Sequence, residues 1–218
     1  MAAQNLAETA LDGSALLRNE PVQARSTARL AGLLDAAAAI IDEIGYERLT
    51  TAMVAERAGA SIGTVYRYFP DRIVLLQSLS ARFLQRFIEH ANTAVRDPKH
   101  ENWGEAITAV IDTIVDAFRS EVGYRSLRLG DVLDIRPAAS AHPGSAVVAQ
   151  TIAAGLAERF DLPTKDLAFH VEVGIDVADS LLARAFAHER NGDERFIVEA
   201  RSIVHSYLVT VYGESVKG

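Results

Sequence analysis

The sequence of 218 residues contains no cysteine, which excludes a disulfide framework and any metal site built on thiolates. It also lacks an uninterrupted apolar run long enough to span a bilayer. Residues 1–20 lack the basic start and apolar stretch of a signal peptide. We therefore expect a soluble cytoplasmic protein that does not use a membrane as a partner.

Several motifs of helical enzymes are missing as well. No Glu-x-x-His pair occurs, so a di-iron helical bundle lacks its ligands, and neither a His-Glu-x-x-His zinc motif nor a glycine-rich phosphate loop is present. No constellation of nucleophile and base is visible. We expect no catalytic residues, no metal and no cofactor.

The chain has little excess of positive charge to offer a nucleic acid. Acidic residues outnumber Lys and Arg by 29 to 22, giving a formal charge of −7. A general nucleic-acid coat is therefore excluded, because such a coat requires a basic surface. Between residues 22 and 72 the two signs balance, however, and arginines stand at segment ends, at Arg25, Arg29, Arg67 and Arg72. A small, locally positive footprint on an acidic body remains compatible with this pattern.

Strand patterns are absent too, because no segment alternates with a period of two and no internal repeat is found. Apolar residues instead recur at offsets of three and four, which predicts helices. The expected helices lie at about 26–45, 52–58, 62–68, 71–96, 103–122, 124–135, 145–160, 164–190 and 196–211, with a mobile tail over 1–21 and a loop over 136–144. The fold class is all-α.

The most informative segment is 50–69, which predicts two short helices joined by a tight turn. We expect Thr51 to cap the first helix and Ser61 to cap the second. Gly59 fits the left-handed residue needed to leave the first helix. Ile62 and Val65, three residues apart, should face that helix. The small, hydroxylated, aromatic and cationic residues Gly63, Thr64, Tyr66, Arg67 and Tyr68 are left facing outward.

This helix-turn-helix and its surroundings resemble the DNA-binding domain of TetR-family transcriptional repressors. The shared patterns are G-Y-x-x-x-T-T from Gly45, A-x-x-A-G-x-S-x-G-T-V-Y from Ala55 and Y-x-Y-F-P-D-R from Tyr66, and the resemblance covers about residues 25–77. Tyr68 stands where the family more often has His, and Arg72 where it more often has Lys. Ile73 replaces a common acidic residue, which leaves Asp71 to cap the next helix.

A helix of this kind contacts phosphates with hydroxyls and arginines and reads base edges in the major groove. Thr51 and Arg72 are expected to reach phosphates from helix N-termini. The candidate DNA-contacting residues are Arg25, Arg29, Thr51, Ser61, Gly63, Thr64, Tyr66, Arg67, Tyr68 and Arg72.

The remaining helices are expected to bind an effector and to form a homodimer, as the resemblance implies. Aromatic residues of the central helices could line an apolar pocket; they are Phe83, Phe87, Trp103, Phe118, Tyr124 and Phe169. An apolar face with small residues on the last two helices is the candidate dimer interface, formed by Leu167, Val171, Gly174, Ala178, Leu181, Leu182, Ala185, Ile203 and Tyr207. Alternatively, that face completes the core of a single chain. The stripe of Glu172, Asp176 and Asp179 is either a solvated face or a rim for a cationic effector.

Together these observations predict a mobile tail over 1–21, a DNA-binding domain over 22–72 and an effector-binding and dimerisation domain over 73–218. The predicted function is a ligand-responsive regulator that binds double-stranded operator DNA as a homodimer. It is expected to be a repressor that an unidentified small molecule releases. Two alternatives stay open, an all-helical enzyme and a DNA-bound architectural protein without an effector.

Overall fold

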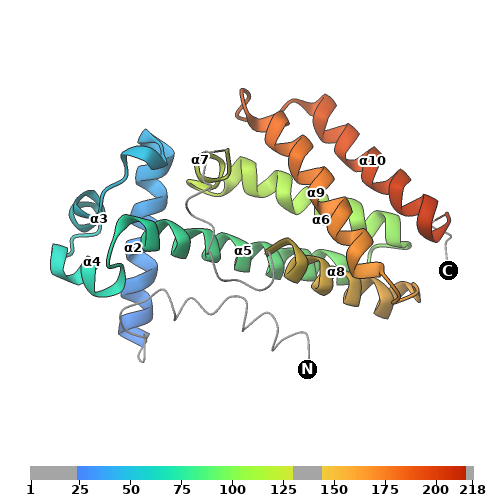
Figure 1. Cartoon of the computed structure of the whole chain (residues 1–218), viewed down its shortest axis with the longest axis horizontal. Coiled ribbons are helices and arrows are strands. Elements are labelled where there is room, and N and C mark those ends of the chain that lie inside the picture. The colour runs from blue at the N-terminus through green and yellow to red at the C-terminus, as the bar shows by residue number, and fades with distance from the viewer. Residues whose placement is uncertain (1–23, 130–143, 215–218) are drawn as a thin grey trace. The chain divides into compact units, whose positions relative to one another are not determined.

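The computed structural model describes residues 24–129 and 144–214, and within these ranges it contains helices and no strand (Figure 1). The all-α prediction is confirmed. The elements are α2 (Ala24–Ile44), the 3-10 helix η2 (Tyr46–Arg48), α3 (Thr51–Arg57), α4 (Ile62–Tyr68), α5 (Arg72–Arg96), α6 (Trp103–Ser120), α7 (Tyr124–Leu129), α8 (Gly144–Phe160), α9 (Leu167–Phe186) and α10 (Glu194–Tyr212). The predicted tail over 1–21 and most of the predicted loop over 136–144 lie outside the described residues.

The chain packs into two units, and the division falls inside α5. Of the described residues, the N-terminal unit contains 24–84 and 121–129, and the C-terminal unit contains 85–120 and 144–214. The sequence predicted a domain boundary after residue 72 and placed 121–129 in the second domain. Packing divides the chain differently because buried Leu75, Leu76 and Leu79 of α5 and Leu127 of α7 join the core around α2.

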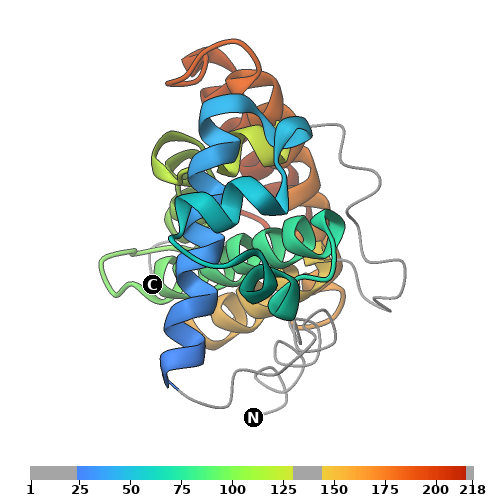
Figure 2. The ribbon, with the colours of Figure 1, turned by 90° about the vertical axis from the view of Figure 1, so that its left-hand side faces the viewer.

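The N-terminal unit is built on the apolar face of α2. Leu33, Ala37 and Ile41 of that helix are fully buried, and their spacing of four residues places them on one side of the helix. Short helices α3 and α4 lie beside α2 (Figure 2). Val54 of α3 and Val65 of α4 are fully buried in the same core. The long helix therefore fixes how the short pair is held.

Two glycines make the turns of this unit possible. Gly59 leaves α3 with φ of 57°, and Gly123 has φ of 78° immediately before α7. Both angles lie in the left-handed region, which glycine adopts without a steric penalty. A Cβ at Gly123 would also lie 2.6 Å from the carbonyl oxygen of Ala38, so glycine lets α7 approach α2 closely.

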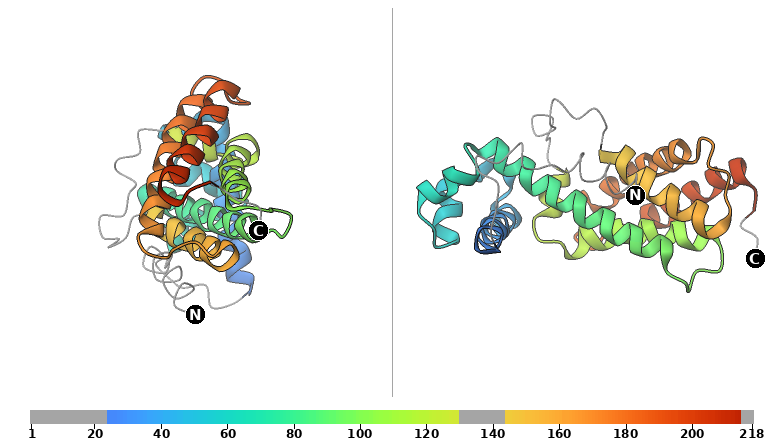
Figure 3. Two further views of the ribbon diagram at one scale, coloured as in Figure 1. Left: turned by 90° about the vertical axis from the view of Figure 1, so that its right-hand side faces the viewer. Right: turned by 90° about the horizontal axis from the view of Figure 1, so that it is seen from below.

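The C-terminal unit packs α9 between α8 and α10, and α6 contacts α8, α9 and α10. The two views of Figure 3 show α9 and α10 side by side along their length. Ile111 and Ile114 of α6, Leu182 of α9 and Val204 of α10 are buried in this core. No helix in the described ranges is both long and apolar enough to cross a membrane.

Candidate nucleic-acid interface

The α3–α4 pair is held by a hydroxyl cap at the start of each helix. Ser61 caps α4 as predicted, since its Oγ accepts a hydrogen bond of 3.1 Å from the backbone N–H of Thr64. The cap of α3 is Thr50, whose Oγ1 accepts from the N–H of Met53 at 3.2 Å. The prediction that Thr51 is the cap is wrong by one residue, because Thr51 already has helical geometry as the first residue of α3.

Capping leaves the hydroxyl of Thr51 free for another contact. Its Oγ1 donates to the hydroxyl of Tyr66 at 3.4 Å, which brings the N-terminus of α3 to the outer side of α4. Tyr66 is 42% exposed. Two of the predicted DNA-contacting side chains are thus brought together on one surface.

The first turn of α4 has an open backbone. Within the described part of the chain, a Cβ at Gly63 would meet only Ser61 Oγ, at 3.9 Å, so no close packing there requires glycine. Next to it, the Oγ atoms of Ser61 and Thr64 lie 2.9 Å apart and share a hydrogen bond. Ser61, Gly63 and Arg67 are exposed. We call the residues Ser61, Gly63, Thr64, Tyr66 and Arg67 the α4 surface.

Two residues predicted for the α4 surface or its inner face lie elsewhere. Tyr68 is 3% exposed, and its hydroxyl shares a hydrogen bond of 2.9 Å with Ser26 Oγ of α2. The prediction that Tyr68 faces outward is therefore wrong, since its ring completes the core below α4. Ile62 was expected to face α3, but its side chain is 43% exposed.

The predicted arginines have different surroundings. Arg29 and Arg67 are exposed, and the guanidinium carbon of Arg67 lies 5.4 Å from the ring centroid of Tyr68. Arg72 is partly buried and donates to the carbonyl oxygen of Tyr46 at 3.2 Å. Its Nε has no hydrogen-bond partner among the residues that the structure describes. Arg72 thus braces the start of α5 against η2. The side chain of Arg25 lies outside the described residues.

The start of α5 agrees with the sequence. Asp71 Oδ1 accepts from the N–H of Val74 at 2.9 Å. This confirms the prediction that Asp71 caps α5, where Ile73 offers no acidic side chain. One ion pair ties α3 to α2, with Arg57 Nη2 at 2.6 Å from Glu43 Oε2. Hydrogen bonds from Arg57 lower the pKa of the Glu43 carboxyl below its usual 4.5. Arg57 is therefore engaged within the unit.

The aromatic residues predicted to line one effector pocket have different ring partners in each unit. Phe83 and Tyr124 pack edge to face at 5.4 Å in the N-terminal unit, whereas Phe118 stacks on Phe186 at 4.6 Å in the other unit. Trp103 stacks on His205, at 5.4 Å between ring centroids.

The last two members of that set are more exposed than the others. Phe87 is only partly buried, and Phe169 is 61% exposed. An apolar gap of about 20 Å³ does exist within the C-terminal unit, but Ile, Val, Leu, Ala and Gly side chains line it. The pocket lined by these aromatics stays a prediction, and the gap found in the C-terminal unit is lined by aliphatic side chains and glycine instead.

The predicted dimer face is largely interior. Buried within the single chain are Leu167, Val171, Gly174, Ala178, Leu182 and Ala185, because that side of α9 packs on α8 and α10. For these residues the alternative of a monomer core is correct. Leu181 and Tyr207 are partly buried and Ile203 is 43% exposed. Tyr207 has its hydroxyl 2.7 Å from Nδ1 of His170.

Over residues 24–129 and 144–214, no group of three or more His, Asp or Glu side chains is placed to hold a metal ion. The arrangement that remains is a pair of capped helices with a hydroxyl-rich, cationic outer surface. Its geometry is that of a helix-turn-helix, which places its second helix in the major groove of DNA.

Two family models match the chain. The model described as "Bacterial regulatory proteins, tetR family" matches residues 33–79, which include α3 and α4. The model described as "Tetracyclin repressor-like, C-terminal domain" matches residues 101–212. The chain belongs to the tetR family of bacterial regulatory proteins, as its sequence motifs predicted.

Individual relatives agree with this assignment. A TetR-family transcriptional regulator from Streptomyces coelicolor has a structure with TM-score 0.69 and 30% identity, covering 84% of this chain and 99% of that one. The transcriptional repressor KstR of Rhodococcus jostii is 34% identical over 89 residues, which are 41% of this chain and 40% of KstR.

A second curated relative carries a different printed role. The nucleoid occlusion factor SlmA of Haemophilus ducreyi is 30% identical over 91 residues, or 42% of this chain and 44% of SlmA. The chain thus matches less than half the length of these two curated relatives.

Proposed function

We propose that the protein is a homodimeric transcriptional repressor that binds double-stranded operator DNA through the α4 surface and is released by a small-molecule effector. The observation that carries the DNA-binding part is the open first turn of α4. Among the described residues, only Ser61 Oγ lies within 4 Å of where a Cβ at Gly63 would be. Nearby hydroxyls and Arg67 of α4 suit close approach to a phosphate backbone. The resemblance to the repressor KstR supports the repressing role.

Dimerisation supports DNA binding because a helix-turn-helix reads two half-sites about 34–36 Å apart through two copies of the chain. The exposed apolar side chains of α9 and α10 are suited to this contact. They include Phe169, Val198, Ile203 and Val211, each at least 41% exposed. We therefore assign the interface to the outer faces of these helices, in place of the buried face predicted from sequence.

Release by an effector requires two states with different affinities for DNA. The apolar gap among α6, α8, α9 and α10 is only about 20 Å³, so an apolar effector would have to separate these helices to enter. Because α5 runs without interruption from one unit into the other, a shift of its C-terminal half would be passed to the helix-turn-helix.

The experiment begins with selection of bound sequences from a random DNA library, followed by titrations of the wild type, Tyr66→Ala and Arg67→Ala. Both variants are expected to bind the selected operator more weakly while remaining folded. If Arg67 contacts a phosphate, its removal lowers the salt slope by about one. If Arg67 reads a guanine instead, its removal lowers the discrimination against other bases at that one position by about 1–3 kcal/mol.

The matched control is Arg190→Ala, which removes an exposed arginine from the C-terminal unit. Unchanged operator affinity in Tyr66→Ala and Arg67→Ala, or an equal loss in Arg190→Ala, would remove the α4 surface from the proposal. The alternative, a DNA-bound protein without an effector, would show operator binding that no compound in a broad ligand screen releases.

A further inference from the structure

The outer side of α4 carries a large apolar side chain that is not a member of the α4 surface. Ile62 is 43% exposed, although it lies directly between the capping residue Ser61 and Gly63. Single exposed apolar residues are common on proteins and by themselves indicate no partner. The place of Ile62 on the helix and the groups around it give this residue a specific use.

The direction of Ile62 follows from the buried residues of α4. Val65 and Tyr68 are buried, so they mark the side of the helix that faces the core. At about 100° per residue, Gly63 lies opposite that side, and Ile62 and Tyr66 lie together on one flank of it. Ile62 is therefore one helical turn from Tyr66, and both side chains are exposed.

The open turn at Gly63 lets a partner come close to the helix beside Ile62. Among the described residues, only Ser61 Oγ lies within 4 Å of a Cβ placed at Gly63. In a helix-turn-helix, the outer side of the second helix enters the major groove, where its side chains meet base edges. A groove that approaches Gly63 therefore meets the aliphatic side chain of the residue next to it.

The hydroxyl groups near Ile62 are hydrogen-bonded to one another. Ser61 Oγ accepts from the N–H of Thr64 at 3.1 Å and shares a hydrogen bond of 2.9 Å with Thr64 Oγ1. On the other side, Thr51 Oγ1 donates to the hydroxyl of Tyr66 at 3.4 Å. The side chain of Ile62 has no polar atom to satisfy, and burying its exposed area against an apolar group is favourable.

The major groove of B-DNA offers one apolar group, the C5-methyl of thymine, among donors and acceptors. An isoleucine placed against a donor or an acceptor would displace water without replacing its hydrogen bond, which costs free energy. Placed against the methyl, it buries apolar surface on both partners. Because Ile is β-branched, its χ1 angle is restricted in a helix, so the contact falls at a defined base pair.

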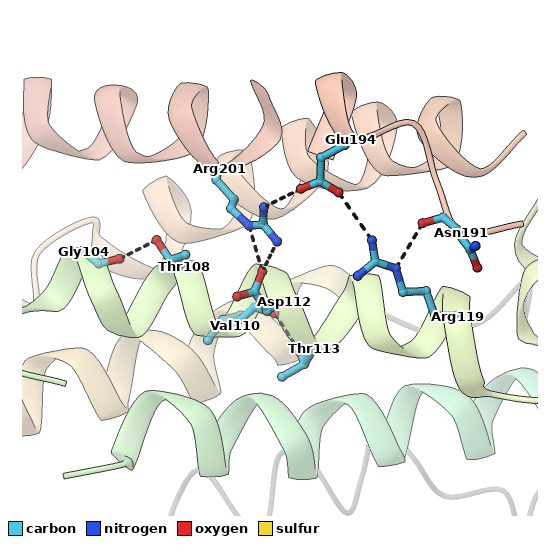
Figure 4. Close-up of polar contacts among 9 residues, drawn as sticks. All are labelled: Gly104, Thr108, Val110, Asp112, Thr113, Arg119, Asn191, Glu194 and Arg201. Carbon is cyan, nitrogen blue, oxygen red and sulfur yellow. Dashed lines mark hydrogen bonds and ion pairs between the residues drawn. The ribbon is translucent and has the colours of Figure 1, made fainter. Parts of the chain in front are cut away.

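The opposite flank of Gly63 carries a cation that the chain does not neutralise. In the C-terminal unit, by contrast, Arg201 pairs with Asp112 and Glu194, as Figure 4 shows. Arg67 makes no hydrogen bond or ion pair within residues 24–129 and 144–214. An apolar side chain beside an unpaired guanidinium favours DNA as the occupant of this face over an apolar protein surface, because DNA supplies both phosphates and methyl groups.

We propose that Ile62 is a specificity-determining residue whose side chain packs on the C5-methyl group of a thymine in each operator half-site. The proposal rests on the proposed DNA-binding function and deepens it, since it names a base feature that the α4 surface reads. Any other base at that position places a donor or acceptor, or no methyl, against the isoleucine. A thymine is therefore preferred there.

The test replaces thymine by uracil, which differs from it only in lacking the C5-methyl group. The probe is the operator duplex selected from the random library, with deoxyuridine at one symmetric pair of thymine positions at a time. At one such pair, the wild type is expected to bind about 15-fold more weakly, or about fourfold for each half-site. This is the effect of withdrawing one methyl-sized group from an apolar contact.

The variant Ile62→Ala removes the protein side of the contact and keeps a good helix former in place. It should bind the thymine operator more weakly, and the uracil pair that weakens the wild type should have little further effect. Such a loss of coupling identifies two groups in direct contact. The matched control is Ile73→Ala, which truncates another exposed isoleucine, at the start of α5. It should keep the full effect of uracil.

Uracil tolerated at every position by the wild type would overturn the role of Ile62, as would an undiminished uracil effect in a folded Ile62→Ala protein. Circular dichroism checks the folding of both variants. If the selection yields no operator, the DNA-binding function itself fails, and the role of Ile62 fails with it. An operator that is bound tightly but is insensitive to uracil overturns the thymine contact alone, so the two failures are distinguishable.

Discussion

At the scale of single residues, two glycines of the N-terminal unit illustrate different reasons for the same residue type. Gly123 has φ of 78°, and a Cβ added there would lie 2.6 Å from the carbonyl oxygen of Ala38. Gly63 has an ordinary helical conformation and open space beside it. The first glycine is needed by the fold, whereas nothing in the fold requires the second.

We predict opposite effects for alanine at these positions. Gly123→Ala should lower the free energy of unfolding by about 1–3 kcal/mol, because it combines a left-handed backbone with a steric overlap. Gly63→Ala should leave stability unchanged or raise it slightly, since alanine favours helix, yet weaken operator binding by excluding the DNA backbone. Urea denaturation and DNA titration measure the two effects. A Gly63→Ala protein with full operator affinity would contradict the proposed approach of DNA.

A second prediction at this scale concerns acid. The pKa of Glu43 is lowered by hydrogen bonds from Arg57, and those of Asp193 and Asp97 by hydrogen bonds from Arg195 and Lys99. A carboxyl whose pKa is lower in the folded state stabilises the fold above its unfolded pKa, and that stabilisation is lost as the pH falls through the folded value. The melting temperature should therefore decrease as the pH is lowered through about 4.5. The decrease should be small because these ion pairs are exposed.

The variant Glu43→Gln isolates the contribution of the Glu43–Arg57 ion pair to the pH dependence of stability, because glutamine does not titrate. This variant should start with a slightly lower melting temperature at neutral pH and lose less of it on acidification than the wild type. Thermal unfolding followed by circular dichroism at a series of pH values gives both numbers. Identical pH profiles for the variant and the wild type would show that the ion pair contributes nothing to stability.

At the scale of elements, the start of α3 depends on which of two adjacent threonines is the cap. Thr50 has extended backbone geometry and accepts from Met53, while Thr51 is helical and reaches Tyr66. Thr50→Ala should therefore cost about 1 kcal/mol of stability, the usual effect of removing a hydroxyl cap. Thr51→Ala should leave stability nearly unchanged and weaken operator binding through the loss of its hydroxyl. Reversed effects in denaturation and DNA titration would reassign the cap.

At the scale of the whole molecule, the proposed dimer uses the outer faces of α9 and α10. Val198→Asp and Ile203→Asp each place a charge on an exposed site of α10, so the chain should fold but sediment as a monomer and lose operator affinity. Ala178→Arg provides a contrast, because Ala178 is 1% exposed inside the single chain, and an arginine there should unfold the C-terminal unit. Sedimentation velocity and circular dichroism distinguish the two results. A stable dimer in both aspartate variants would place the interface elsewhere.

The sequence by itself determined the positions of the helices and the presence of a helix-turn-helix. Helical periodicity, the capping residue Ser61 and the left-handed Gly59 act over a few residues, so their effect can be predicted without the rest of the chain. The same holds for Asp71 at the start of α5. One-residue errors such as Thr51 for Thr50 arise because adjacent threonines are equally good caps.

Only the tertiary structure decided which faces are buried. Tyr68 looked like a surface residue because its neighbours are exposed, but α2 provides Ser26 for its hydroxyl and a core for its ring. The apolar face of α9 could have served a partner or its own chain, and the packing of α8 and α10 on it settled the matter. Burial is a property of the whole packing, since it depends on which other segments arrive at a surface.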